Sequence, residues 1–325
     1  MMIHHVAFGL RVSATERIPC LKVVENPHGE PAHLHLWIQQ RPAVSGGEQV
    51  LISGSHRGKS RTPPVEVSWL PDDALYCFRY RDGTLFFIGG QGTEIWTVWQ
   101  DPYTIEDMAT YLLGPVMGFV LRLRGVTPLH ASAVGVGGRA LALLGQRRAG
   151  KSTTAAAFAA AGFAVLADDV AAVDESAGAF CVRAGYPHLR LWPEAVEILY
   201  GRRDALRPIT PNWDKRDLEL EDDSGLTFQN ASLPLRAIYV LGARRDDERA
   251  PFIETMTTRE SFMTLTANTY VNYALDQRMR SEEFGMIGRI VASVPVCRVV
   301  PHSDPNKVWQ LRDVILADFG KICSG

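Results

Sequence analysis

An eight-residue pattern near the middle of the chain constrains the fold more than any other feature of its 325 residues. Residues 145–152 read GQRRAGKS, which has the spacing G-x4-G-K-S. The residues before them, 139–144 (RALALL), predict a short apolar strand, and 152–161 are helix formers that predict a helix. A strand, this loop and a helix in that order are the context that a phosphate-binding loop requires.

The residue types of this loop suit a triphosphate. The two glycines let the backbone curl so that successive N–H groups point inward, and the positive end of the following helix faces the same anion. Lys151 would neutralise charge on the β- and γ-phosphates, and the Ser152 hydroxyl would bind magnesium. A chance match is the alternative, but the flanking patterns count against it. The residues expected to bind ATP are Gly145, Arg147, Arg148, Ala149, Gly150, Lys151, Ser152 and Thr153.

Two adjacent aspartates follow the next predicted strand. The helix ends at Gly162, residues 163–167 (FAVLA) predict a strand, and Asp168 and Asp169 come directly after it. Because a strand–helix–strand unit makes its two strands parallel, their carboxyl ends would lie at one edge of the sheet. One aspartate could hold magnesium and the other accept a proton from an attacking hydroxyl. A simple turn is the alternative reading, and the residues leave open which aspartate takes which role.

A histidine precedes the phosphate loop. His130 lies in the run 129–134, which predicts a strand that pairs with 139–144 through the glycine-rich turn 135–138. Its place on a neighbouring strand makes a catalytic role and an ordinary core or surface role equally plausible.

Basic residues offer further contacts. Lys215 and Arg216 could close over the transferred phosphate, although a surface charge cluster is the alternative. Arg147 and Arg148 could contact phosphate, an acidic substrate or solvent. The loop 53–64 is also basic, and a solvated loop explains it most simply.

The first part of the chain has β character. Aromatic-rich runs flank Asp82-Gly83, which indicates a hairpin, and a turn at 89–92 leads to a third strand at 94–99. Earlier strands are predicted at 3–12, 34–39 and 50–53.

A helix links this part to the phosphate loop. Thr104 and Asp107 form a capping-box pattern, and apolar residues then recur at helical spacing over 104–124. The predicted fold class is α/β, with a β-rich N-terminal domain at 1–125 and a P-loop catalytic domain at 126–325.

Composition excludes several classes of partner. The net charge of −2, from 34 basic and 36 acidic residues, gives no footprint for nucleic acid. Five cysteines without a C-x-x-C pair argue against a disulfide framework and a structural zinc site. The start lacks a signal-peptide core, and uncharged stretches such as 108–121 are shorter than the roughly 18 residues of a membrane span. We expect a cytoplasmic protein with no membrane contact.

Together with His130, the run GQRRAGKSTTAAAFAAAGFAVLADDVAAV (145–173) resembles the catalytic domain of HPr kinase/phosphorylase and its kinase-only relatives. These enzymes share a histidine on a strand before the loop, a G-x4-G-K-S/T loop, and an A-D-D turn one helix later. Residues 186–193 (YPHLRLWP), 214–216 (DKR) and 234–241 are similar with less specificity.

The resemblance implies an ATP- and magnesium-dependent kinase that phosphorylates a serine hydroxyl on a peptide or protein. Asp168 matches the family's catalytic base, and Asp169 matches the acidic neighbour that lies with Ser152 near the metal. His130 matches the strand histidine. No glycine-rich copy of the bifunctional enzymes' signature follows, so phosphorylase activity is not expected. Family members often assemble, which leaves a homo-oligomer open.

The β-rich N-terminal part resembles homologues encoded beside lasso-peptide biosynthesis enzymes. Those homologues modify the C-terminal serine of a precursor peptide.

Three other functions stay open. A small-molecule kinase would use the same site, because the fold does not specify the acceptor. A nucleotide hydrolase would use water, although the absence of an N-K-x-D motif counts against a GTPase. A non-catalytic nucleotide sensor is the third.

Overall fold

The computed structural model describes residues 2–26, 29–52, 65–176, 178–220 and 225–324. Contacts divide the chain into two compact units. The first comprises Met1–Gly125, Thr210–Asn212 and Val271–Asp276, and the second Val126–Ile209, Trp213–Tyr270 and Gln277–Gly325. The basic loop 53–64 lies outside the described residues. In the described part of the chain, helices of sufficient length and apolarity to cross a bilayer are absent.

The first unit contains an eight-stranded sheet, in the order β1-β2-β3-β8-β7-β6-β5-β4. The predicted three-strand meander is confirmed, since β6, β7 and β8 pair antiparallel in sequence order and Gly83 takes a φ of +86° in the first turn. The strands are β1 (Ile3–Ala7), β2 (Leu10–Ala14), β3 (Leu34–Ile38), β4 (Gln49–Ile52), β5 (Val65–Leu70), β6 (Leu75–Tyr80), β7 (Leu85–Gly89) and β8 (Glu94–Val98).

Two predictions for this unit need correction. The single strand expected at 3–12 is a hairpin, because Phe8 and Gly9 both take positive φ and reverse the chain between β1 and β2. The helix expected at 104–124 is interrupted. It consists of α1 (Ile105–Tyr111), the π-helical η1 (Leu112–Val116) and α2 (Met117–Leu123).

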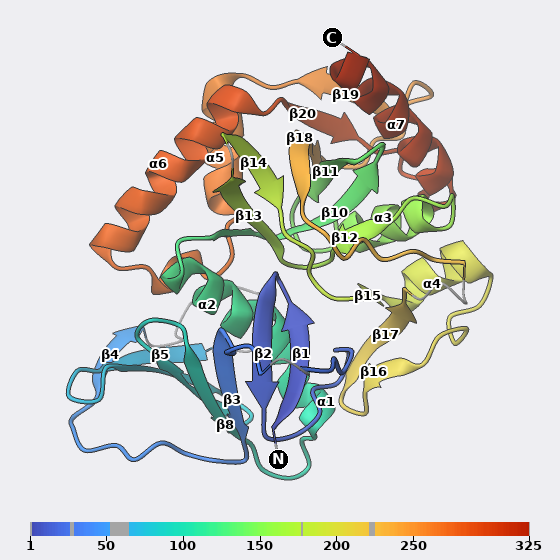
Figure 1. Cartoon of the computed structure of the whole chain (residues 1–325). Helices are drawn as coiled ribbons and strands as arrows, with labels where there is room; N and C mark the ends of the chain where they lie inside the picture. Colours follow the sequence, from blue (N-terminus) through green and yellow to red (C-terminus); the bar gives the residue numbers. More distant parts are fainter. Residues whose placement is uncertain (1, 27–28, 53–64, 177, 221–224, 325) are drawn as a thin grey trace. The chain divides into compact units, whose positions relative to one another are not determined.

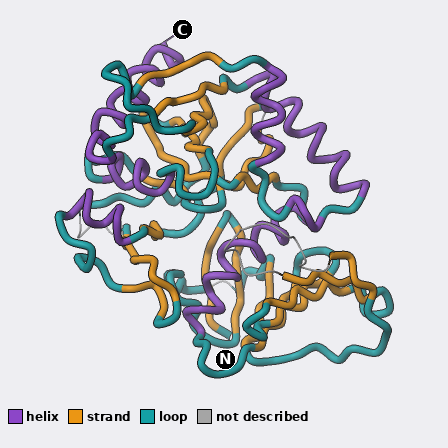
Figure 2. The backbone as a smooth tube through the Cα atoms, turned by 180° about the vertical axis from the view of Figure 1, so that it is seen from behind, coloured by secondary structure: helices purple, strands orange, loops and turns teal. Residues whose placement is uncertain are grey.

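The interruption has a local cause. Pro115 has no N–H to donate to the preceding turn, and Gly114 leaves helical geometry with φ −112° and ψ −105°. The predicted start is confirmed, because the Asp107 carboxylate accepts a 2.9 Å hydrogen bond from the Thr104 N–H. Phe119 of α2 packs on Tyr76 and Phe78 of the sheet. Figure 2 traces the backbone from the opposite side, with helices in purple and strands in orange. The short helix η3 (Asn272–Ala274) also belongs to this unit.

The second unit contains a nine-stranded sheet. Seven of its strands follow the order β12-β10-β11-β18-β14-β13-β9. The other two branch from β18, because β20 pairs with β18 and β19 pairs with β20. The strands β10, β11 and β18 agree with predictions from the sequence. The strands are β9 (Thr127–Leu129), β10 (Ala131–Val136), β11 (Arg139–Leu144), β12 (Val165–Ala167), β13 (Ala171–Ser176), β14 (Ala179–Val182), β18 (Leu233–Leu241), β19 (Phe252–Thr255) and β20 (Val296–Val300).

Helices cover both faces of this sheet (Figure 1). Leu141 and Leu143 of β11 join one core with α3 (Lys151–Ala159) and α7 (Val308–Ser324). The intervening Ala142 joins a second core with α5 (Thr258–Ala267) and α6 (Gln277–Ser293). The alternation follows from the two-residue period of a strand and buries β11 on both sides. The short helix η4 (Pro305–Lys307) precedes α7.

The strand direction predicted for the phosphate-loop unit is confirmed with one difference. β11 and β12 are both antiparallel to β10, so they run parallel to each other, but β10 lies between them. Leu144 and Ala167, the last residues of β11 and β12, face the first half of β10. The segments that follow these two strands therefore begin at one edge of the sheet, beside the start of β10.

A smaller sheet of three strands lies in the order β15-β17-β16. Its strands are β15 (His188–Leu191), β17 (Trp213–Glu219) and β16 (Pro208–Thr210), and α4 (Pro193–Tyr200) follows β15. Leu189 and Leu218 pair across β15 and β17 and join the core that contains α3. The opposite face is polar and aromatic, and it supplies several side chains of the site.

Candidate functional site

The predicted strand–loop–helix arrangement is present, with the loop 145–150 joining β11 to α3. Gly145 has a φ of +149°, and a Cβ added there would lie 3.0 Å from the carbonyl oxygen of Leu241. Gly150 precedes α3 with a φ of +104°. Both positions favour glycine, since other residues rarely adopt such φ values. Arg148 adopts a φ of +68° without that freedom, which marks a strained turn at the middle of the loop.

Lys151 begins α3 and folds back onto its own loop. Its side chain is buried, and Nζ donates to the carbonyl oxygens of Gly145 at 2.7 Å and Gln146 at 3.3 Å. Burial lowers the pKa of Lys151, and the carboxylates of Asp169 and Asp168 oppose that effect. The ammonium group thus lies inside the loop, where an anion bound by the loop N–H groups would meet it.

Asp168 is the most enclosed acidic group of the site, with 2% of its surface exposed. Its Oδ1 accepts hydrogen bonds from the hydroxyls of Ser132 at 2.6 Å and Ser152 at 2.8 Å. Its Oδ2 accepts the backbone N–H of Arg190 at 3.0 Å. The carboxylate therefore joins β10, the start of α3 and β15, and it holds the Ser152 hydroxyl at a defined position.

Asp169 faces different partners. Its φ of +68° turns the chain after β12. Oδ1 lies 3.2 Å from His130 Nδ1, and Oδ2 accepts a 2.8 Å hydrogen bond from the Tyr270 hydroxyl. The same histidine nitrogen lies 3.1 Å from the Asp169 carbonyl oxygen. Because both partners of Nδ1 are acceptors, that nitrogen carries a proton.

Opposing effects set the ionisation of this carboxyl. Burial raises the pKa of Asp169, but the hydrogen bond and charge of His130, with the nearby cations Lys215 and Arg190, hold it well below its usual range. Burial and the adjacent Asp169 raise the pKa of the Tyr270 phenol well above its ordinary value. Asp169 is therefore an anion and Tyr270 a neutral donor near neutral pH.

Backbone pairing brings Tyr270 to the site. The His130 N–H donates to Asn268 at 2.7 Å, and the Tyr270 N–H donates to Pro128 at 2.7 Å. These bonds surround an antiparallel bridge between Leu129 and Thr269. One short contact between distant segments thus orients both side chains that hold Asp169.

The polar face of the three-stranded sheet adds cations and tryptophans. Lys215 Nζ lies 5.6 Å from the ring centre of Trp192 and 5.1 Å from that of Trp213. Arg148 Cζ lies 4.8 Å, and Arg147 Cζ 5.9 Å, from the ring centre of Trp192. Burial lowers the pKa of Lys215, whereas Asp169 and Asp168 raise it. Both loop arginines therefore meet Lys215 at a single indole.

Arg216 is placed differently from its neighbour. It pairs with Asp214, with Nη2 3.1 Å from Oδ1, and it faces Leu191 across the ladder. Because neighbouring residues of a strand point to opposite faces, Lys215 and Arg216 cannot share one contact. The structure brings Lys215, and not Arg216, toward the acidic pair.

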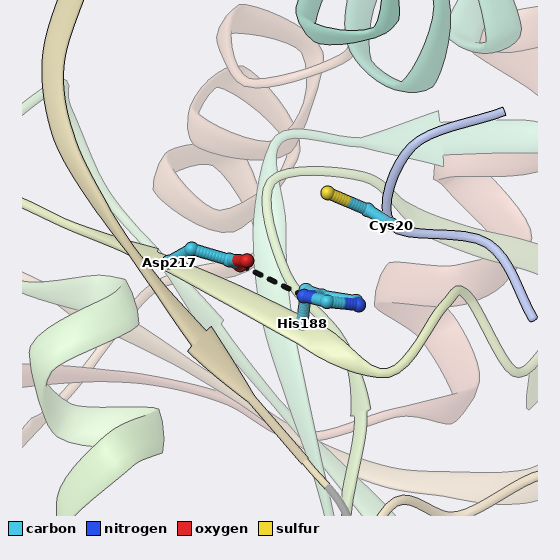
Figure 3. A group of neighbouring side chains, drawn as sticks. All are labelled: Cys20, His188 and Asp217. Atoms are coloured by element: carbon cyan, nitrogen blue, oxygen red, sulfur yellow. Dashed lines mark hydrogen bonds and ion pairs between the residues drawn. The ribbon is translucent and has the colours of Figure 1, made fainter. Parts of the chain in front are cut away.

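A buried histidine–aspartate pair lies farther along the same sheet face. His188 Nδ1 is 2.8 Å from Asp217 Oδ1 (Figure 3), and Arg207 donates to Asp217 Oδ2 at 3.0 Å. Burial raises the pKa of Asp217. The hydrogen bonds and charges of His188 and Arg207 together lower it by more, so the pKa of Asp217 lies below its ordinary value. This pair connects β15 to β17 and stabilises the sheet that carries Trp192 and Lys215.

Most of the predicted site residues converge at the described edge of the sheet. Ala149 packs against the core, and Thr153 is half-buried in the first turn of α3. Sequence reasoning missed four contributors, which are Ser132, Arg190, Trp192 and Tyr270. Ser132 lies two residues after His130 on a predicted strand, so the period of a strand was the available signal. Tyr270 has no such signal, because its approach depends on the pairing of distant segments.

Comparisons with known proteins find a likeness to solved structures but none to a sequence family. No protein-family model matches the sequence, and no curated protein matches it. A solved structure described as the Hpr(Ser) kinase/phosphatase from Coxiella burnetii is similar over 61% of this chain and 93% of that chain. The identity is 12% and the TM-score 0.36, a level of likeness that does not bear on activity. The function is therefore argued from the residues of the site.

Proposed function

We propose that the chain is an ATP- and magnesium-dependent kinase that transfers the γ-phosphate to a serine hydroxyl of a peptide or protein. One observation carries the proposal. The Ser152 hydroxyl, in the first turn of α3, meets the acidic pair at one sheet edge, with Ser152 Oγ 2.8 Å from Asp168 Oδ1. Phosphoryl transfer needs a phosphate cradle, charge neutralisation and a group that receives the acceptor's proton. The second unit offers residues for each need.

The loop and its lysine would hold the triphosphate. Backbone N–H groups at the start of α3 and the helix dipole favour an anion at this point. Lys151 now donates to the loop carbonyls of Gly145 and Gln146, and a phosphate oxygen would replace those acceptors. Exchange of a neutral acceptor for an anionic one strengthens the hydrogen bond.

The donor set fits magnesium. Ser152 and Asp168 present a hydroxyl and a carboxylate side by side, and magnesium prefers such oxygen ligands. We assign these two residues to the metal, whereas the resemblance implies Ser152 and Asp169. Bound there, magnesium would neutralise charge on the phosphate oxygens.

Asp169 then becomes the group that receives the proton. Transfer forms a bond between the serine oxygen and the γ-phosphorus, breaks the bond to the ADP oxygen, and releases the serine proton. Asp169 would accept that proton, held in place by His130 and Tyr270. A weakly basic carboxylate suits a loose transition state, in which the hydroxyl loses its proton late. His130 is a positioning residue in this scheme.

The nature of the acceptor rests on the sequence resemblance. It favours a peptide or protein serine, and the C-terminal serine of a lasso-peptide precursor is the specific candidate. The test incubates the full chain with γ-labelled ATP, Mg²⁺ and peptides that end in serine, and follows phosphate gain by mass spectrometry. Phosphopeptide formation by the wild type and its loss in Lys151→Ala support the proposal. ATP hydrolysis that no peptide alters would identify a hydrolase instead.

A further inference from the structure

Three cations gather at one tryptophan beside the phosphate loop. Arg148 and Arg147 come from the loop itself, and Lys215 comes from β17. All three lie within 6 Å of the Trp192 ring centre, with Arg148 Cζ at 4.8 Å, Arg147 Cζ at 5.9 Å and Lys215 Nζ at 5.6 Å. Trp213 completes the group, since its ring centre lies 6.4 Å from that of Trp192 at 87°. We call these five residues the tryptophan–cation cluster.

The cations of the cluster form no direct ion pair in the described part of the chain, although Asp168 and Asp169 act on Lys215 from a longer distance. Among the residues that the structure describes, no carboxylate forms an ion pair with Arg147, Arg148 or Lys215. Like charges brought together repel one another, and the indole face offsets only part of that repulsion. The strained φ of +68° at Arg148 adds a further cost. Such an arrangement is stabilised when an anion binds to it.

In the proposed kinase the nucleotide phosphates would have other partners. Lys151 Nζ lies against the loop carbonyl of Gly145, where the start of α3 favours an anion. The two arginines are exposed and lie at Trp192, on the side of the three-stranded sheet. We therefore assign them to this cluster, and no longer to the ATP-binding residues among which the sequence placed them. Lys215 connects the two regions, because its ionisation responds to Asp168 and Asp169 as well as to Arg147. An anion at the cluster would therefore lie beside the reacting groups and outside the phosphate cradle.

We infer that the tryptophan–cation cluster binds a carboxylate of the acceptor peptide, on the serine that is phosphorylated or on a residue next to it. The inference rests on the proposed kinase function and defines its substrate class as acidic at the point of transfer. Guanidinium groups bind carboxylates through paired N–H donors, and a peptide's own anions are carboxylates. The indole ring holds the arginine planes in place before the peptide binds.

Two pairs of synthetic peptides test this inference. In the first pair, a terminal serine carries either a free carboxylate or an amide; in the second, an internal serine is followed by Glu or by Gln. We expect one or both charged peptides to have a KM about tenfold below that of the neutral partner. The pair that shows the difference identifies the terminal or the side-chain carboxylate as the source.

Variants then assign the difference to the cluster. Arg147→Gln combined with Arg148→Gln should raise the KM of the charged peptide about tenfold and leave that of the neutral peptide within about twofold. The MgATP affinity, measured by calorimetry without peptide, should stay within about threefold. Arg202→Gln is the matched control, because it removes an exposed arginine of the same unit that pairs with Asp204.

Charge reversal gives an independent readout. Arg147→Glu combined with Arg148→Glu should favour a peptide in which Lys follows the serine over the one with Glu. Equal KM values for charged and neutral peptides in the wild type would overturn the inference. A double Gln variant that loses MgATP affinity would also overturn it, by assigning the arginines to the nucleotide. If the wild type binds MgATP and phosphorylates none of the four peptides, the proposed function fails, and this inference with it.

Discussion

Replacement of Asp169 by Asn is the sharpest test of the assigned roles. The amide keeps the shape of the side chain and tolerates the positive φ of +68° found at this position. It also keeps an oxygen that can accept the hydrogen bond from Tyr270. The change therefore removes a negative charge and a proton acceptor, and preserves most of the local geometry.

The expected loss follows from those two changes. A group that accepts the proton in the transition state contributes about 10²- to 10⁴-fold to the rate, so we expect kcat with MgATP and a serine peptide to fall by that amount. MgATP should bind as well as before or slightly more tightly. The wild-type Asp169 carboxylate is an anion near Lys151 and Lys215, and its removal leaves the positive charge of both lysines to the phosphates. The half-buried contact between the Asp169 carboxylate and His130 Nδ1 is lost, which costs about 1–3 kcal/mol of folding stability.

Single-turnover transfer and calorimetric nucleotide titration measure these quantities separately. Asp168→Asn is the matched comparison, since it alters the carboxylate that holds Ser152 at 2.8 Å and should mainly weaken magnesium-dependent nucleotide binding. Urea unfolding of each variant checks that a folded protein is assayed. Two results together would refute Asp169 as the proton acceptor and make Asp168 the base. The transfer rate of Asp169→Asn would lie within threefold of the wild type, and Asp168→Asn would be inactive yet bind MgATP normally.

Three further outcomes are expected. Lys151→Ala should abolish transfer and weaken MgATP binding at least about tenfold, measured by titration, because the buried ammonium is lost from the loop. Tyr270→Phe should lower kcat about tenfold, because the hydrogen bond to Asp169 is lost. The shape of the pH–rate profile between pH 6 and 8 should not change, because burial raises the phenol pKa far above that range. A changed profile would contradict this role. Asp217→Asn should destabilise the fold by about 1–3 kcal/mol at pH 7, through loss of the contact with His188. The Asp217 pKa lies below its ordinary value of 3.8, so this stabilisation is present above pH 4 and disappears as the pH falls through the folded-state pKa; a difference in thermal unfolding that persists at pH 2 would contradict it.

The sequence predicted the parts of the site that depend on local pattern. The strand 139–144, the glycine loop and the helix after it follow from residue type and spacing within one stretch, and the structure has β11 and α3 there. The α/β class and the three-strand meander of the first unit were accessible for the same reason. Hairpins and phosphate-type loops are short, so their signals lie in neighbouring residues.

The parts that depend on distant pairing were not predicted. Tyr270 reaches Asp169 through a bridge between segments about 140 residues apart, as Leu129 and Thr269 show. The sequence offers Lys215 and Arg216 together as contacts for the transferred phosphate, whereas β17 separates them by the alternation of a strand. The run WDKRDLE contains that alternation, because its first, third and fifth residues are the ones on the polar sheet face. A strand assignment there would have distinguished the two residues.

The position of β10 explains how two adjacent aspartates acquire different surroundings. A simple parallel crossover would place β12 directly beside β11. Instead β10 lies between them, and the residues at its start face the turn after β12. Ser132 donates to Asp168, and His130 contacts Asp169, so two residues of one strand hold the two carboxylates separately. Each carboxylate then has its own second partner.

That separation is what makes a division of roles possible. Two equivalent carboxylates at one point would compete for a single cation and share a proton. Here Asp168 is tied to the Ser152 hydroxyl, whereas Asp169 is tied to an imidazole and a phenol that cannot lose its proton near neutral pH. A Ser132→Ala variant should therefore disturb the metal-side carboxylate alone. It should raise the Mg²⁺ concentration needed for half-maximal transfer and leave the rate at saturating Mg²⁺ within about threefold; a loss of rate that Mg²⁺ cannot restore would show that the two carboxylates act as one unit.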